Sequence, residues 1–236
     1  MPHSNVHIGQ KRAAIIAAAA LLAMGVLAPI AFFVVLEPIQ KAGDAVAQIN
    51  LLQASEAMFR ISILIFFVVA VLDILLAWAL HGFFSPANSH LSLLAAWFRL
   101  VYTAVLLFAT ASLVEVLNLL QAPAPNSPEW RLLIQHTFNG FFTVFNFGLG
   151  IFGFHLIVLG YLIIRTNLLP SLLGALVVIA GLGYLIDTLG SVLLAQYHLN
   201  IASFTFFGEV LLIGWLLWWG FKRTIRADSA GREATS

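Results

Sequence analysis

Seven ionisable side chains stand inside long apolar stretches of this sequence, where hydrocarbon or protein would surround them in place of water. They are Arg60, Asp73, Arg99, Glu115, His155, Asp187 and Glu209. An ionisable group within a bilayer is costly and tends to face a protein interior or a wet cavity. Such groups can pair with one another, carry protons or hold a polar ligand. A buried arginine requires an anionic partner, because it does not lose its proton.

Four of these groups share a predicted inner layer. Counting from the predicted cytoplasmic end of each helix at about 1.5 Å per residue places Asp73 and His155 roughly 15 Å deep. The same count places Arg99 roughly 12 Å and Glu209 roughly 20 Å deep. Side chains at similar depths on neighbouring helices are able to meet.

The remaining groups form a predicted outer layer of Arg60, Asp187 and Glu115, nearer the opposite face. Each arginine then has an acid at a similar depth. We therefore predict two ion pairs, Asp73 with Arg99 and Arg60 with Asp187. Either pair would be rejected by a structure that holds its members far apart and facing lipid.

Two interpretations of the charged layers remain open. In the first, the pairs only lock helices together, since polar side chains commonly bond across membrane helices. In the second, intramembrane charges mark a pathway. A polar cavity then opens to the cytoplasm, with an unknown ligand, lined by Asp73, Arg99, His155, Asp187 and Glu209.

Motifs for metals and for catalysis are missing. No helix carries His-x-x-x-His or His-Glu-x-x-His, so we predict no metal and no cofactor. Mixed ligation by His155 and the acids stays open in principle. Catalytic residues are unknown, because no Gly-x-Ser-x-Gly turn marks a nucleophile. These observations favour a protein that is not an enzyme.

Small residues gather on one face of the fifth predicted helix, together with an acid. Ala180, Gly183, Asp187, Gly190 and Ser191 share that face. Small side chains allow close approach of two membrane helices. We predict that Gly183 and Gly190 are packing sites and that Asp187 points inward.

The elements that must position these residues are long and apolar. Hydrophobic residues make up 61% of the 236 and charged residues only 9%, against about 25% in soluble domains. A spanning helix needs about 20 apolar residues. We predict an all-α, polytopic six-helix transmembrane bundle forming a single transmembrane domain over 1–236. Its helices are expected at 13–36, 57–84, 91–120, 141–165, 170–196 and 201–221. Short amphipathic segments are expected at 40–54 and 129–140.

Prolines and glycines predict irregularities within these helices. Pro29 is expected to bend the first helix, because proline removes a backbone donor and clashes with the preceding turn. Asn139–Gly140 is expected to separate an interfacial segment from the fourth span. Glycines 148, 150 and 153 are further candidate kinks in that span.

Charge sets the expected orientation and location. Lys11–Arg12, Arg165 and the basic residues at 222–226 flank one side of the layout, so both termini are expected in the cytoplasm. The expected location is the bacterial cytoplasmic membrane, as a multi-pass protein. Net charge is +1, which excludes a strongly basic nucleic-acid surface. Cysteine is absent, which removes disulfides and thiolate chemistry.

Several runs of polar and aromatic residues occur in an order that resembles a known family. They are Trp97-Phe-Arg99-Leu-Val-Tyr102, Phe154-His155-Leu, Leu159-Gly-Tyr-Leu162, Leu169-Pro-Ser-Leu-Leu-Gly174, Ala180-Gly-Leu-Gly-Tyr-Leu-Ile-Asp187 and Gly208-Glu209. They resemble the domain-of-unknown-function (DUF) family 4386 of bacterial integral membrane proteins. The resemblance implies the six-helix fold and the selection of Arg99, His155, Asp187 and Glu209. It implies no substrate and no catalytic residue.

We therefore interpret the chain as an integral membrane protein of unknown function whose buried charged cluster holds the bundle and lines a small cavity. One alternative is a proton-coupled small-molecule transporter that uses His155, Asp187 and Glu209. Another is an intramembrane enzyme that modifies lipids. The lipid bilayer is the expected partner and nucleic acid is not. A homo-oligomer is compatible with such a bundle, although no residue pattern selects one.

Overall fold

The computed structural model describes residues 2–122, 127–166, 168–205 and 207–219. Within these residues the structure is helical and contains no strand. Among the same residues, six helices are long and apolar enough to cross a membrane. These findings confirm the all-α fold with six candidate spans. The cytoplasmic placement of both termini stays a prediction, and Lys222, Arg223 and Arg226 lie outside the described residues.

The first candidate span, Gly9–Gln40, changes helix type at the proline. It joins α1 (Pro2–Pro29), the π-helix η1 (Ile30–Leu36) and α2 (Glu37–Gln40). The amide of Glu37 bonds to the carbonyl of Phe32, five residues earlier, as a π-helix requires. Where a bend was predicted at Pro29, the structure therefore places a wider helical turn directly after it.

A short helix, α3 (Ala45–Ala54), follows within the predicted segment 40–54. Asp44 caps its N-terminus, since the Asp44 side chain accepts a hydrogen bond from the amide of Ala47 at 2.8 Å. Ile49 and Leu52, three residues apart, are buried. The helix therefore turns this face toward protein.

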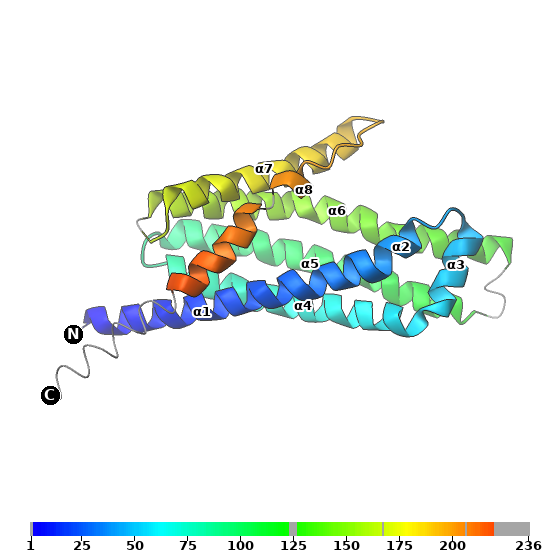
Figure 1. The fold of residues 1–236 in the computed structure, drawn as a ribbon, viewed down its shortest axis with the longest axis horizontal. Coiled ribbons are helices and arrows are strands. Elements are labelled where there is room, and N and C mark those ends of the chain that lie inside the picture. The colour runs from blue at the N-terminus through cyan, green and yellow to red at the C-terminus, as the bar shows by residue number, and fades with distance from the viewer. Residues whose placement is uncertain (1, 123–126, 167, 206, 220–236) are drawn as a thin grey trace. The chain divides into compact units, whose positions relative to one another are not determined.

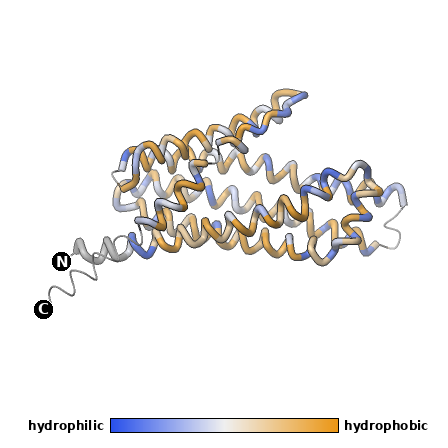
Figure 2. Tube along the Cα trace, viewed as in Figure 1, coloured by the Kyte–Doolittle hydropathy of each residue, from blue (hydrophilic) through white to orange (hydrophobic). Residues whose placement is uncertain are grey.

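The remaining elements are α4 (Glu56–Phe84), α5 (Ser89–Leu120), α6 (Pro128–Arg165), α7 (Ser171–Leu193) and α8 (Ala202–Thr205). They lie close to the predicted ranges, except that α6 begins well before the predicted residue 141. Residues 207–219, here called the terminal helix, complete the sixth candidate span, Ala202–Trp219. Hydrophobic residues run along the long helices (Figure 2).

One predicted boundary is wrong, because α6 is a single helix of 38 residues without a break at Asn139–Gly140. Phe138 and Phe141, on either side of these residues, are fully buried. Burying a phenylalanine gains about 1.5–3 kcal/mol, whereas a helical glycine costs about 1 kcal/mol. The free energy gained by burying the flanking aromatic rings therefore outweighs the cost of placing Gly140 inside a helix.

The chain divides into two compact units. The first comprises Met1–Leu22, Asp73–Val101 and Leu149–Ser236, and the second comprises Ala23–Leu72 and Tyr102–Gly148. A single transmembrane domain over 1–236 stays a prediction. The second unit has an aromatic core. The ring of Phe66 lies 5.2 Å from that of Phe141, and Phe145 stacks on Phe141 at 5.6 Å.

The first unit contains a close seam between α6 and α7, which run side by side (Figure 1). Gly153 faces Gly181, and Gly160 faces Gly174. A Cβ atom on any of the four would lie 2.5–2.7 Å from the carbonyl oxygen of the glycine opposite. The expected kinks at 150 and 153 are therefore packing sites, since Gly150 in turn lies against Thr188. These glycines allow the two backbones to touch.

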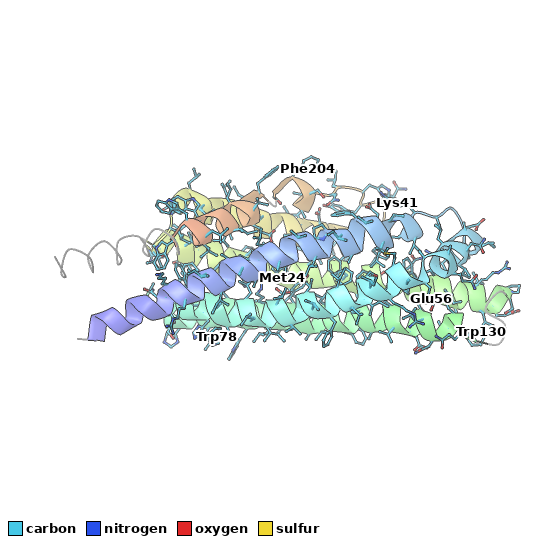
Figure 3. The ribbon with its side chains drawn as sticks, turned by 60° about the horizontal axis from the view of Figure 1, so that its bottom comes forward. Met24, Lys41, Glu56, Trp78, Trp130 and Phe204 are labelled. Carbon is cyan, nitrogen blue, oxygen red and sulfur yellow. The ribbon has the colours of Figure 1, made fainter. Side chains whose placement is uncertain are left out.

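Large apolar side chains on the outer faces of the helices are exposed. Trp78 on α4 is 63% exposed and projects outward, as does Phe204 on α8 at 79% (Figure 3). A protein in water rarely exposes a continuous apolar surface. This pattern suits helices surrounded by lipid.

Candidate functional site

The centre of the first unit is an ion pair between Asp73 on α4 and Arg99 on α5. Nε of Arg99 lies 2.7 Å and Nη2 lies 2.6 Å from the same oxygen, Oδ1 of Asp73. The two side chains are only 3% and 5% exposed. The structure thus brings together the first of the two predicted pairs.

His155 on α6 joins this pair from the other side of the guanidinium group. Its Nε2 lies 3.0 Å from Nη1 of Arg99, and its Nδ1 lies 2.8 Å from the carbonyl oxygen of Ala95. A carbonyl only accepts hydrogen bonds and a guanidinium only donates them. His155 is therefore neutral, with its proton on Nδ1 and its Nε2 lone pair directed at Arg99. Asp73, Arg99 and His155 are called the buried cluster below.

Helix length explains why these three residues meet. Asp73 lies eleven residues before α4 ends, Arg99 ten after α5 begins, and His155 ten before α6 ends. At 1.5 Å per residue, each lies roughly 15 Å from its helix end. The turn between α4 and α5 is closed in part by Asn88, whose side chain accepts a hydrogen bond from the amide of Leu91. The equal depth predicted from sequence thus corresponds to a direct contact.

Two aromatic residues that the sequence analysis did not select connect the buried cluster to Glu209. Phe152 stacks on His155 at 5.6 Å, and the guanidinium carbon of Arg99 lies 5.2 Å from the same ring. Phe152 meets Tyr184 edge to face at 5.5 Å. Tyr184 in turn donates a hydrogen bond of 3.1 Å to Oε1 of Glu209. The three-residue spacing of Phe152 and His155 was the available signal, since it places both on one helical face.

Glu209 belongs to the same layer but not to the ion pair. It lies ten residues before Trp219 on the terminal helix. It is linked to Arg99 through the Tyr184 hydroxyl and the Phe152 ring. Among the described residues Glu209 forms no salt bridge. Its carboxyl group accepts a hydrogen bond from the neutral hydroxyl of Tyr184.

Asp187 on α7 binds other groups than Arg60, its predicted partner. Its carboxylate accepts hydrogen bonds from the Tyr197 hydroxyl at 2.5 Å and from the amides of Ile201 and Ala202 at 2.9 and 2.8 Å. Asp187 thereby caps the start of α8 from a neighbouring helix, which satisfies amides that have no partner within their own helix. The bond to Asp187 raises the pKa of the Tyr197 hydroxyl to about 12.

The predicted pairing of Arg60 with Asp187 is therefore wrong. Arg60 is exposed and pairs at 2.7 Å with Glu56, four residues earlier on α4. An acid one turn away supplies a local partner. Glu115, also exposed, accepts a hydrogen bond from Asn118 at 3.1 Å. Arg60 and Glu115 thus find partners within one turn of their own helices.

The two predicted packing glycines both lie against other side chains. A Cβ on Gly183 would collide with the Thr205 hydroxyl, and one on Gly190 would collide with the Tyr197 ring. Both contacts hold α7 against the segment that leads into the terminal helix. Asp187 lies between these two glycines in sequence and makes its own contacts to the same segment.

A narrow hollow lies beside His155. Its walls are alanine, leucine and phenylalanine side chains of α4, α5 and α6, with Ser92 and His155 as the polar members. It leaves no room for a water-sized molecule. Within the described ranges, no three His, Asp or Glu side chains are grouped closely enough to hold a metal ion.

Comparison with known proteins adds a family but no activity. The family described as "Domain of unknown function (DUF4386)" matches residues 16–220. An uncharacterized protein of Archaeoglobus fulgidus is 34% identical over 161 residues, which cover 68% of this chain and 85% of that protein. No solved structure matches the chain.

Proposed function

We propose that the buried cluster is a structural lock, which means that it holds three helices of a multi-pass integral membrane protein together. The chain belongs to the DUF4386 family, whose function is unknown. The observation that carries this proposal is the reciprocal bonding of Asp73, Arg99 and His155. These residues come from α4, α5 and α6, three candidate spans. Lipid tails are as apolar as leucine, so polar contacts and close packing hold membrane helices together.

The arrangement supports a lock better than acid–base chemistry. Arg99 cannot give up its proton. The Nε2 lone pair of His155, which a general base would need, accepts a hydrogen bond from Arg99. Asp73 accepts two N–H groups on one oxygen. The hollow beside His155 supports the predicted small cavity only as a narrow apolar space.

The remaining predictions belong to this proposal. The protein is expected in the bacterial cytoplasmic membrane, with the lipid bilayer as its partner and both termini in the cytoplasm. The six apolar helices support a membrane location. Their exposed outer faces support contact with lipid.

A double-mutant cycle tests the lock. Asp73→Asn and Arg99→Gln should each lower the free energy of unfolding in detergent micelles by about 3–5 kcal/mol, because each leaves a buried charge without its partner. The charge-free double variant Asp73→Asn/Arg99→Gln should lose much less than the sum of the two. The measurement is the denaturant midpoint of each purified variant.

The exposed pair of Arg60 and Glu56 provides the matched control. Glu56→Gln and Arg60→Gln remove the same kinds of charge from a solvent- or headgroup-exposed site, where a pair contributes about 0–1 kcal/mol. If Asp73→Asn and Arg99→Gln cost no more than these control variants, the buried cluster is not a lock.

A further inference from the structure

We propose that Glu209 is a proton-binding site inside the membrane domain, coupled through Arg99 to the buried cluster. This inference goes beyond the lock, because it assigns a ligand, the proton, to a fourth residue of the same layer. On binding, an O–H bond of hydronium breaks and an O–H bond to a carboxyl oxygen of Glu209 forms, which leaves a water molecule; release of the proton to water reverses the step.

The charges that face Glu209 do not balance if it is ionised. Arg99 from α5 supplies one positive charge and Asp73 from α4 one negative charge, while His155 from α6 is neutral. Tyr184 from α7 offers a neutral hydroxyl. An ionised Glu209 would therefore be a second carboxylate near a single cation, at a partly buried position in the bundle where an unpaired charge is costly. A bound proton removes that charge.

The geometry fits a protonated carboxyl group. Oε1 of Glu209 accepts the hydrogen bond of Tyr184, as the carbonyl oxygen of a carboxylic acid can. Arg99 is already bonded to Asp73 through two N–H groups and to His155 through a third. Loss of the proton would add a second negative charge beside the Asp73–Arg99 pair, to which Glu209 is linked through Tyr184 and the Phe152 ring. Proton binding and the Asp73–Arg99 pair are thereby coupled.

The terminal helix that carries Glu209 is positioned against α7. A Cβ on Gly208, the adjacent residue, would lie 2.6 Å from the carbonyl group of Leu176. At the start of α8, Asp187 holds the amides of Ile201 and Ala202. These contacts fix the backbone that leads into Glu209, so its carboxyl group has a defined place beside Tyr184. A titratable carboxyl in this position is what a proton-coupled carrier would use.

Infrared spectroscopy of the purified protein in lipid nanodiscs tests the proposal directly. Near neutral pH the wild-type protein should show the carbonyl-stretch band of a protonated carboxylic acid, and Glu209→Gln should lose it. Glutamine keeps an oxygen acceptor for Tyr184, so folding is expected to survive. Glu115→Gln is the matched control, since it removes an exposed acid and should leave the band intact.

A second variant keeps the test decisive even if Glu209→Gln fails to fold. Tyr184→Phe removes the hydrogen bond to Oε1 and should move the band to higher frequency without abolishing it. An absent band in the wild type, a band that survives Glu209→Gln, or a band unmoved in Tyr184→Phe would overturn the assignment.

Thermal unfolding at different pH values tests the coupling between Glu209 and the buried cluster. Raising the pH until the band disappears should lower the thermal unfolding midpoint of the wild type more than that of Glu209→Gln. An equal loss of stability in both proteins would overturn the coupling. The lock is tested separately by the mutant cycle at one pH, so failure of either proposal can be recognised on its own.

Discussion

Nε2 of His155 lies 3.0 Å from Nη1 of Arg99, and this contact joins the α6 helix to the ion pair formed by α4 and α5. The opposite ring nitrogen is bound to the carbonyl of Ala95, so the tautomer of His155 follows from its neighbours. Histidine here is a connector between helices, and the orientation of its ring is fixed at both nitrogen atoms.

This contact predicts the protonation state of His155. Nitrogen-15 NMR of the histidine side chains should show His155 as the neutral tautomer with the proton on Nδ1. His155→Ala should lower the free energy of unfolding by about 1.5–3 kcal/mol, because it leaves a donor of a charged group without its acceptor. An Nε2-protonated signal, or unchanged stability in the alanine variant, would contradict the assigned bonding.

The glycine seam predicts opposite effects for one substitution at two sites on α6. In Gly160→Ala the new Cβ would lie 2.6 Å from the carbonyl oxygen of Gly174, so α6 and α7 must move apart at a cost of about 1–3 kcal/mol. Nothing lies within 4 Å of a Cβ at Gly140. Gly140→Ala should be neutral or stabilise by up to about 1 kcal/mol. Denaturant unfolding in micelles measures both, and equal stabilities would argue against the seam.

The cap formed by Asp187 predicts local exchange behaviour. Asp187→Ala removes the acceptor for the amides of Ile201 and Ala202, so hydrogen exchange at both should accelerate. Loss of a helix cap costs about 0.5–2 kcal/mol. Tyr197→Phe serves as the control, because it deletes a different partner of the same carboxylate and leaves both amides bonded. Mass spectrometry of exchanged peptides covering 194–205 would report the difference, and unaltered protection in Asp187→Ala would count against the cap.

Tyr197 predicts a pH dependence at the alkaline end. Its pKa is raised to about 12 in the folded protein, against about 10 for a free tyrosine. The contribution of the neutral hydroxyl is therefore fully present below pH ~10 and is lost as the pH rises toward about 12. Difference absorbance of tyrosinate between wild type and Tyr197→Phe isolates this residue. A midpoint near pH ~10 would show that the Asp187 contact does not form in solution.

Gly183 tests the close approach of α7 to α8. Gly183→Leu would drive a side chain into Thr205, so folded yield should fall as far as it does in Asp187→Ala. The neighbouring residue Leu182 is 45% exposed, and Leu182→Val serves as the control. Recovery of folded protein from membranes by size-exclusion chromatography measures each, and normal yield of the leucine variant would exclude the contact.

The sequence by itself determined the number and type of the candidate spans and the position of each charge along its helix. Apolar run length fixes where a helix can cross a membrane, and a constant rise per residue converts position into depth. That is why Asp73, Arg99 and His155 could be assigned to one layer before any contact was known. Local signals sufficed here because helices are built from local hydrogen bonds.

The tertiary structure alone decided which groups at a given depth meet. Asp187 found the amides ahead of α8 and the Tyr197 hydroxyl in place of Arg60, while Arg60 found Glu56 on its own helix. Depth does not determine how far each helix is rotated about its axis. That rotation is set by packing, such as the contact of Gly160 with Gly174, and packing involves residues that are distant in sequence.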